Sequence, residues 1–153
     1  MKLEVGHQAP DFQLPDSQGE VRKLSDYAGQ TIVLYFYPKD DTPGCTKEAC
    51  SFRDSYQEFK AAGVEVVGIS PDSTKSHSKF AQKYELPFTL LADPDHQVCE
   101  SYGVWGLKKY MGREYNGVYR TTFVIGPDGK IKQIFENVKP TDHSLEVLEA
   151  VKA

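Results

Sequence analysis

The stretch from residue 32 to residue 50 combines a short apolar run with a polar loop and a helical pattern. Residues 32–37, Ile-Val-Leu-Tyr-Phe-Tyr, have the length and the β-branched and aromatic character of a buried strand. Pro38 ends this strand, and Thr42-Pro43 predicts a helix start, since a hydroxyl can cap free N–H groups and proline suits the first helical position. Apolar residues then recur at steps of three and four, which predicts a helix running to about Ala62.

Short apolar or alternating runs predict the remaining strands, and apolar residues at steps of three and four predict the remaining helices. Residues 64–70 read as a second buried strand, so the order strand, helix, strand implies a right-handed crossover with parallel pairing. Other expected elements are an N-terminal hairpin at 9–15 and 21–24, helices at 72–84, 96–102 and 142–151, a strand at 87–91, and a hairpin at 119–125 and 130–135. Residues 103–117 contain several glycines and aromatics without a clean period, so an irregular surface segment is expected there.

This order of elements indicates an α/β protein with a thioredoxin-like fold. The expected architecture is a central mixed sheet flanked by helices, with an added N-terminal β-hairpin. We expect a single domain over residues 1–153, since the length suits one domain and no Pro/Gly/Ser-rich linker divides the chain. The Cys-x-x-Cys motif of thioredoxin itself is absent.

Charge and composition narrow the possible partners and the compartment. A formal net charge of -4 without a dense Lys/Arg run argues against a nucleic-acid or anionic-membrane partner. The N-terminus lacks the apolar core of a signal peptide, and no stretch has the length of a membrane span, so a cytoplasmic location is expected. In that compartment the three cysteines are more often catalytic, redox-active or inert than part of a disulfide framework.

Cys45 is the candidate for reactive chemistry, because it falls in the first turn of the predicted helix at the carboxyl edge of the sheet. The positive end of the helix dipole favours the thiolate, which is the nucleophilic form. The alternative is a buried free cysteine that acts as a small hydrophobe. Its neighbours favour the reactive role: Thr42 supplies a hydroxyl, Pro43 and Gly44 allow a close approach, and Cys50 adds a second thiol.

The spacing Pro-x-x-x-Thr-x-x-Cys, at Pro38, Thr42 and Cys45, resembles the active-site motif of peroxiredoxins. The phrase from Phe36 to Cys50 closely resembles the bacterioferritin comigratory protein, or Q-type, branch, and the likeness covers essentially the whole chain. The resemblance implies that Cys45 is the peroxidatic cysteine, whose thiolate attacks a peroxide oxygen and becomes a sulfenic acid.

Three neighbouring side chains acquire expected roles from the same resemblance. Arg120 matches the family's active-site arginine, which can stabilise the thiolate and the charge on the departing oxygen; a solvated arginine at a strand end is the alternative. The Thr42 hydroxyl can hydrogen-bond the peroxide, cap the helix, or do both. Glu48 corresponds to a glutamate that orients the arginine, although first-turn helix electrostatics explains it nearly as well.

The loop residues around the sulfur have supporting roles by resemblance. Pro38 and Pro43 would shield the sulfur from water and shape the loop. The alternative is that each proline only marks the end of a strand or the start of a helix. Backbone N–H groups of Gly44 and Cys45 are further donors for the bound oxygens.

The resemblance also implies that Cys50 is the resolving cysteine, which forms an intramolecular disulfide with Cys45 that thioredoxin reduces. In an ideal helix, residues five apart have Cα atoms roughly 8.6 Å apart and point about 140° away from each other. This separation exceeds the ~7 Å limit for a disulfide, so resolution must unwind the first helical turns. The alternative for Cys50 is a core cysteine, and Cys99 is assigned to packing.

We therefore expect a monomeric thiol-dependent peroxidase that reduces hydrogen peroxide and small organic hydroperoxides without haem, flavin or metal. No metal site is expected, since the four histidines lie in scattered polar contexts without ligand spacing. One alternative is a peroxide-responsive redox sensor or adaptor, in which Cys45 oxidation changes the fold for a partner to read. Another is a thioredoxin-like disulfide exchanger, which the cysteine separation and the presence of Thr42 and Arg120 disfavour.

Overall fold

The computed structural model describes residues 3–152 and contains a central mixed sheet of five strands. The strand order is β5 (Thr89–Ala92), β4 (Val64–Ser70), β3 (Thr31–Phe36), β8 (Thr121–Ile125) and β9 (Ile131–Phe135). Strands β3, β4 and β5 pair in parallel, whereas β8 runs antiparallel to β3 and β9 antiparallel to β8. The predicted parallel crossover and the predicted C-terminal hairpin are both confirmed.

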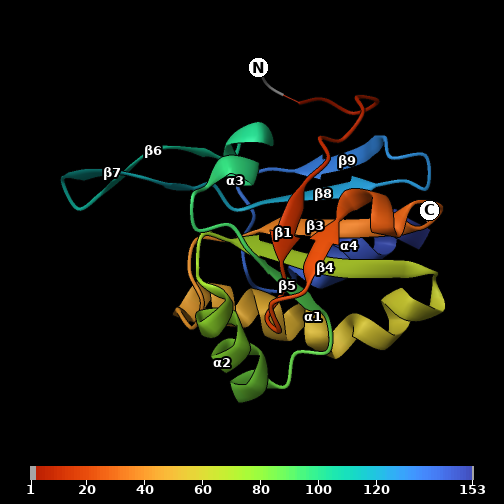
Figure 1. Ribbon diagram of the computed structural model, residues 1–153, viewed down its shortest axis with the longest axis horizontal. Helices are drawn as coiled ribbons and strands as arrows, with labels where there is room; N and C mark the ends of the chain where they lie inside the picture. Colours follow the sequence, from red (N-terminus) through yellow and green to blue (C-terminus); the bar gives the residue numbers. More distant parts are fainter. Residues whose placement is uncertain (1–2, 153) are drawn as a thin grey trace.

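The sheet is covered on both faces (Figure 1). Helices α1 (Pro43–Ala61), α2 (Thr74–Tyr84) and α4 (His143–Lys152) pack on one face, and the other carries β1 (Gln13–Pro15), α3 (Gln97–Ser101) and Tyr27 of η1 (Leu24–Tyr27). Strand β1 pairs antiparallel with β2 (Val21–Lys23), so the added N-terminal hairpin is confirmed. The mixed five-stranded sheet with helices on it agrees with the expected thioredoxin-like fold.

Strand β3 reads as a continuous apolar run because both of its faces are buried. Ile32, Leu34 and Phe36 point into one core cluster, and Val33 and Tyr35 point into the other. Within residues 3–152, no helix has both the length and the apolar composition that crossing a membrane requires.

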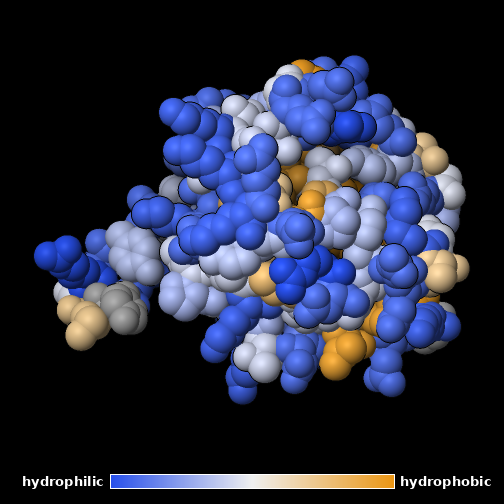
Figure 2. All heavy atoms as spheres, turned by 90° about the horizontal axis from the view of Figure 1, so that it is seen from below, coloured by the Kyte–Doolittle hydropathy of each residue, from blue (hydrophilic) through white to orange (hydrophobic). Residues whose placement is uncertain are grey.

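The prediction of an irregular segment at 103–117 is wrong. Its residues form β6 (Trp105–Tyr110) and β7 (Arg113–Val118), a separate antiparallel pair that we call the β6–β7 arm. The arm projects sideways from the body of the molecule, at the left of Figures 1 and 2. Four of the six β7 residues are exposed, so no face is selected for burial and the alternation of a half-buried strand is missing.

The pairing of β3 with β8 brings two distant parts of the chain to one point. Phe36, at the carboxyl end of β3, lies opposite Thr121, the first residue of β8. The loop that follows β3 leads into α1, and Arg120 immediately precedes β8. The amino end of α1 and Arg120 therefore meet at the same edge of the sheet.

Candidate active site

Cys45 lies in the first turn of α1, as predicted, and its side chain is buried. Helix α1 begins at Pro43, so the sulfur sits where the free N–H groups and the positive end of the helix dipole favour an anion. The Nη2 atom of Arg120 donates a hydrogen bond to Cys45 Sγ at 3.3 Å. Two positive fields thus meet at one buried sulfur.

Arg120 bridges the sulfur to a buried carboxylate. While its Nη2 atom faces Cys45, its Nη1 atom donates to Glu48 Oε1 at 2.7 Å. Burial acts to lower the pKa of Arg120, but the negative charges of Glu48 and Cys45 outweigh it and raise the pKa above its usual value. Only 16% of the Arg120 side chain is exposed, which does not fit a solvated arginine at a strand end.

Glu48 is fully buried and only half of its carboxylate is satisfied. Oε1 accepts from Arg120, whereas Oε2 has no hydrogen-bond partner among the described residues. Burial raises the pKa of Glu48 to about 7, because the loss of hydration outweighs the attraction of the Arg120 charge. Glu48 therefore does more than serve helix-terminus electrostatics: it fixes the guanidinium against the sulfur.

Glu48→Gln is expected to stabilise the protein at and above neutral pH. The folded-state pKa of Glu48 lies above its ordinary value of 4.5, so the favourable contribution is complete below about pH 4.5 and disappears as pH rises through about 7. The shift corresponds to about 3 kcal/mol. Unfolding free energies measured across this range should fall for the wild type relative to Glu48→Gln, and parallel curves would contradict the assignment.

Thr42 occupies the N-cap position of α1, but its hydroxyl does not cap the helix. The Oγ1–H group donates to the Lys39 carbonyl oxygen at 2.9 Å, and no side-chain cap bond is present. The predicted capping bond is therefore wrong. Because its hydrogen is already used, the Thr42 oxygen is left to accept a hydrogen bond, which a hydroperoxide O–H can donate.

Gly44 permits the arginine to approach the helix. A Cβ atom at this position would lie 3.2 Å from Arg120 Nη2 and 3.4 Å from Pro140 Cγ, closer than most such contacts. Pro43 takes the first helical position, as predicted, and Pro38 is half-buried just beyond β3.

The other two cysteines differ in exposure. Cys50 is half-buried and lines a groove of about 510 Å³ between α1 and the start of α4, so it is not a core cysteine. Cys99 is completely buried, and its backbone N–H donates to Asp93 Oδ2 at 2.8 Å. Burial raises the pKa of Cys99 well above its usual range, which suits the packing role assigned to it.

A polar cluster near the site, buried except for the half-buried Asp72, has no signal in the sequence. Asp40, Asp72 and His77 offer oxygen and nitrogen atoms that lie within 4.8 Å of one another, close enough for a metal ion. However, these atoms already take part in hydrogen bonds with Tyr37, the Asp40 backbone N–H and each other. His77 is fully buried, contrary to the polar context expected from its neighbours, and its partner Asp40 is 37 residues away in sequence.

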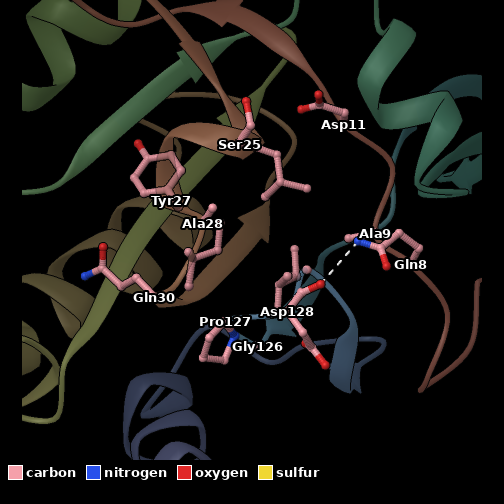
Figure 3. Close-up of a pocket in the computed structure, with 14 residues that line it drawn as sticks. Gln8, Ala9, Asp11, Ser25, Tyr27, Ala28, Gln30, Gly126, Pro127 and Asp128 are labelled. Atoms are coloured by element: carbon pink, nitrogen blue, oxygen red, sulfur yellow. Dashed lines mark hydrogen bonds between the residues drawn. The ribbon is translucent and has the colours of Figure 1, made fainter.

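A second cavity, of about 420 Å³, opens at the other end of the sheet (Figure 3). It lies between η1 and the β8–β9 turn, where Ile32, the second residue of β3, pairs with Ile125, the last residue of β8. Gln8 bridges its rim through a bond from its side-chain amide to the Asp128 carbonyl oxygen. None of its lining residues is a cysteine, so it is separate from the thiol site.

Comparisons with known proteins identify the family. The AhpC/TSA family matches residues 5–134. Peroxiredoxin Bcp of Bacillus subtilis is 49% identical over 152 residues, covering 99% of this chain and 97% of the relative, and peroxiredoxin Bcp of Escherichia coli K12 is 51% identical over 150 residues, covering 98% and 96%.

Solved structures give the same result at the level of the fold. Peroxiredoxin Q of Xanthomonas campestris has a TM-score of 0.90 at 39% identity, with 98% of this chain and 95% of that chain covered. A structure of the bacterioferritin comigratory protein of that organism, studied for its alkyl peroxide reduction activity, has a TM-score of 0.90 at 38% identity, with 98% and 96% covered. The chain therefore belongs to the AhpC/TSA family and, within it, to the peroxiredoxins of the bacterioferritin comigratory protein (Q-type) branch.

Proposed function

We propose that this chain reduces hydrogen peroxide and organic hydroperoxides with Cys45 as the nucleophile. The observation that carries the proposal is the 3.3 Å contact between Arg120 Nη2 and Cys45 Sγ, made by an arginine that Glu48 holds in place. The alkyl peroxide reduction activity of the Xanthomonas relative supports organic hydroperoxides as substrates. Thiol-dependent peroxidase activity is the activity of the branch to which the chain belongs.

In the proposed first step, the Cys45 thiolate attacks the hydroperoxide oxygen that carries the proton. A sulfur–oxygen bond forms, the oxygen–oxygen bond breaks, and the departing alkoxide or hydroxide takes up a proton to leave as alcohol or water. Arg120 stabilises the negative charge both on the sulfur and on the departing oxygen. The Thr42 hydroxyl oxygen accepts from the peroxide O–H and so aligns the oxygen–oxygen bond with the sulfur.

In the second step, the Cys50 thiolate attacks the Cys45 sulfenic sulfur: the sulfur–sulfur bond forms, the sulfur–oxygen bond breaks, and the departing hydroxide takes up a proton to leave as water. Both cysteines belong to α1, so the first turns of the helix must open before the sulfurs can meet. Opening breaks the bonds from Arg120 to Cys45 and Glu48, which ties disulfide formation to the loss of the peroxide site. A thioredoxin dithiol then reduces the disulfide.

The proposed cycle also bears on the oligomeric state and the cellular compartment. Since the disulfide joins two cysteines of one chain, a monomer suffices for turnover. Recycling by thioredoxin requires a reducing compartment, which favours the cytoplasm. The cycle uses electrons from thiols alone.

Cys50→Ser is expected to lower thioredoxin-dependent turnover by roughly tenfold or more, because the Cys45 sulfenic acid then has no internal thiol to condense with. The assay follows NADPH in the presence of thioredoxin, its reductase and peroxide. Cys99→Ser is the matched control, since its thiol is buried away from the site, and it should retain activity within about twofold. Equal loss in both variants would contradict the assignment.

The same proteins separate the rival functions. A disulfide exchanger would reduce insulin disulfides without peroxide, whereas the proposed peroxidase would not. A sensor would oxidise once and then turn over poorly. Mass spectrometry of the peroxide-treated wild type should find Cys45 bonded to Cys50, and a bond from Cys45 to Cys99 would overturn the proposed pairing.

A further inference from the structure

A buried carboxylate holds the loop that joins β3 to α1. The Asp40 side chain is 3% exposed and accepts hydrogen bonds on both oxygens. The Tyr37 hydroxyl donates to Oδ1 at 2.5 Å, while the Ser76 hydroxyl donates to Oδ2 at 2.8 Å and His77 Nδ1 lies 2.7 Å from the same oxygen. Ser76 and His77 belong to α2, so these hydrogen bonds attach the loop to a separate helix.

The contact between His77 and Asp40 contains a proton. The Nε2 atom of His77 lies 2.9 Å from the Leu91 carbonyl oxygen, which can only accept, so Nε2 carries a hydrogen. On the other side of the ring, Nδ1 and the carboxylate oxygen would both be acceptors unless one of them were protonated. One shared proton therefore links the fully buried ring to the Asp40 side chain, which is itself 3% exposed.

Two further attachments hold the same loop. The Asp40 backbone N–H donates to Asp72 Oδ2 at 2.8 Å, which fixes the main chain as well as the side chain. The next residue, Asp41, has a left-handed φ of 56°, and its exposed carboxylate accepts from Lys83 Nζ and the Tyr84 hydroxyl, each at 2.8 Å. The loop is thus attached to α2 by a buried inner bond set at Asp40 and an exposed outer one at Asp41.

The fixed loop determines where the Thr42 hydroxyl points. That hydroxyl donates to the carbonyl oxygen of Lys39, and this carbonyl belongs to the peptide unit whose N–H, on Asp40, donates to Asp72. Any rotation of the peptide would move both bonds together. From this geometry we infer that Asp40 and His77 are positioning residues of the peroxidase reaction, which act through Lys39 to aim the Thr42 oxygen at the peroxide.

This inference rests on the proposed function, and two reactions of the same sulfur test it separately. In a Cys50→Ser, Cys99→Ser background, Cys45 is the only thiol. Hydrogen peroxide needs an aligned oxygen–oxygen bond, and its reaction is followed as sulfenic acid trapped by dimedone. Iodoacetamide only needs the thiolate, and its reaction is followed by mass. Asp40→Ala is expected to slow the peroxide reaction by roughly tenfold to a hundredfold, with little change in alkylation.

Matched variants distinguish positioning from general loosening. Lys83→Ala removes the exposed outer ion pair from the α2 side without altering the left-handed backbone of Asp41, and its ratio of peroxide to alkylation rate should stay within about twofold of the parent. Asp40→Asn keeps an acceptor for Tyr37 and gains an N–H that can donate to a neutral His77 Nδ1, so it should restore most of the ratio lost in Asp40→Ala.

An unchanged ratio in Asp40→Ala, or an equal drop in Lys83→Ala, would overturn the inference. So would an Asp40→Asn variant as slow as Asp40→Ala, since hydrogen bonding would then not be the cause. If Asp40→Ala does not fold, Ser76→Ala decides in the same assays: a severalfold lower ratio supports the inference and an unchanged one overturns it. A parent protein that does not react with peroxide would instead refute the proposed function.

Discussion

Cys45→Ser is expected to abolish peroxide turnover, to below roughly one thousandth of the wild-type rate. A serine hydroxyl at this position stays protonated and is a poor nucleophile toward an oxygen–oxygen bond. Neither remaining thiol is equipped to replace it: Cys50 lines the α1–α4 groove, and Cys99 is buried beside Asp93. The measurement is peroxide-dependent NADPH oxidation with thioredoxin and its reductase in excess.

The substitution should leave the fold intact, which makes the loss interpretable. The serine oxygen can accept the hydrogen bond that Arg120 Nη2 now donates to the sulfur, so no buried donor is left without a partner. Circular dichroism and the thermal midpoint should therefore remain close to the wild type. If a folded Cys45→Ser protein kept more than about a tenth of the activity, another thiol would be the nucleophile and the proposed function would be wrong.

Elements with a buried face could be predicted from the sequence, because burial imposes a period on the residues. Strand β3 and helix α1 were expected within one residue of their observed ends, and β4 at its observed bounds. The β6–β7 arm was missed because it lacks such a buried face. Its strands bond to each other rather than to the sheet, and β7 is mostly exposed, so its residues carry no burial pattern.

Some site residues could be predicted from their neighbours in the sequence, whereas others depend on contacts with distant residues. Cys45 could be placed from the helix start alone, since dipole and position are local. Arg120 and Glu48 required the family resemblance, because their contact joins residues 72 apart in sequence. His77 gave no signal at all: its neighbours in the chain are polar, and its burial depends on Asp40 and on the carbonyl of Leu91.

Arg120→Met is expected to slow oxidation of Cys45 by peroxide by roughly a hundredfold to a thousandfold. The guanidinium reaches the sulfur and Glu48 with separate nitrogen atoms, at 3.3 Å and 2.7 Å. Methionine fills similar space without charge, so both the thiolate and the departing oxygen lose their cation. Arg120→Lys should recover only part of the rate, because one ammonium group cannot reproduce the two-pronged geometry. Stopped-flow measurement of the oxidation step is the readout.

Loss of stability must be separated from loss of rate, and Glu48 allows this. In Arg120→Met the buried Glu48 carboxylate has no cation beside it, which costs about 3–5 kcal/mol of stability when the glutamate is ionised. Adding Glu48→Gln removes that charge, so the double variant should regain most of the stability at alkaline pH, where the glutamate would otherwise ionise, while the oxidation rate stays low. If the rate returned together with the stability, Arg120 would only support the fold, and the sulfur would owe its reactivity to the helix terminus alone.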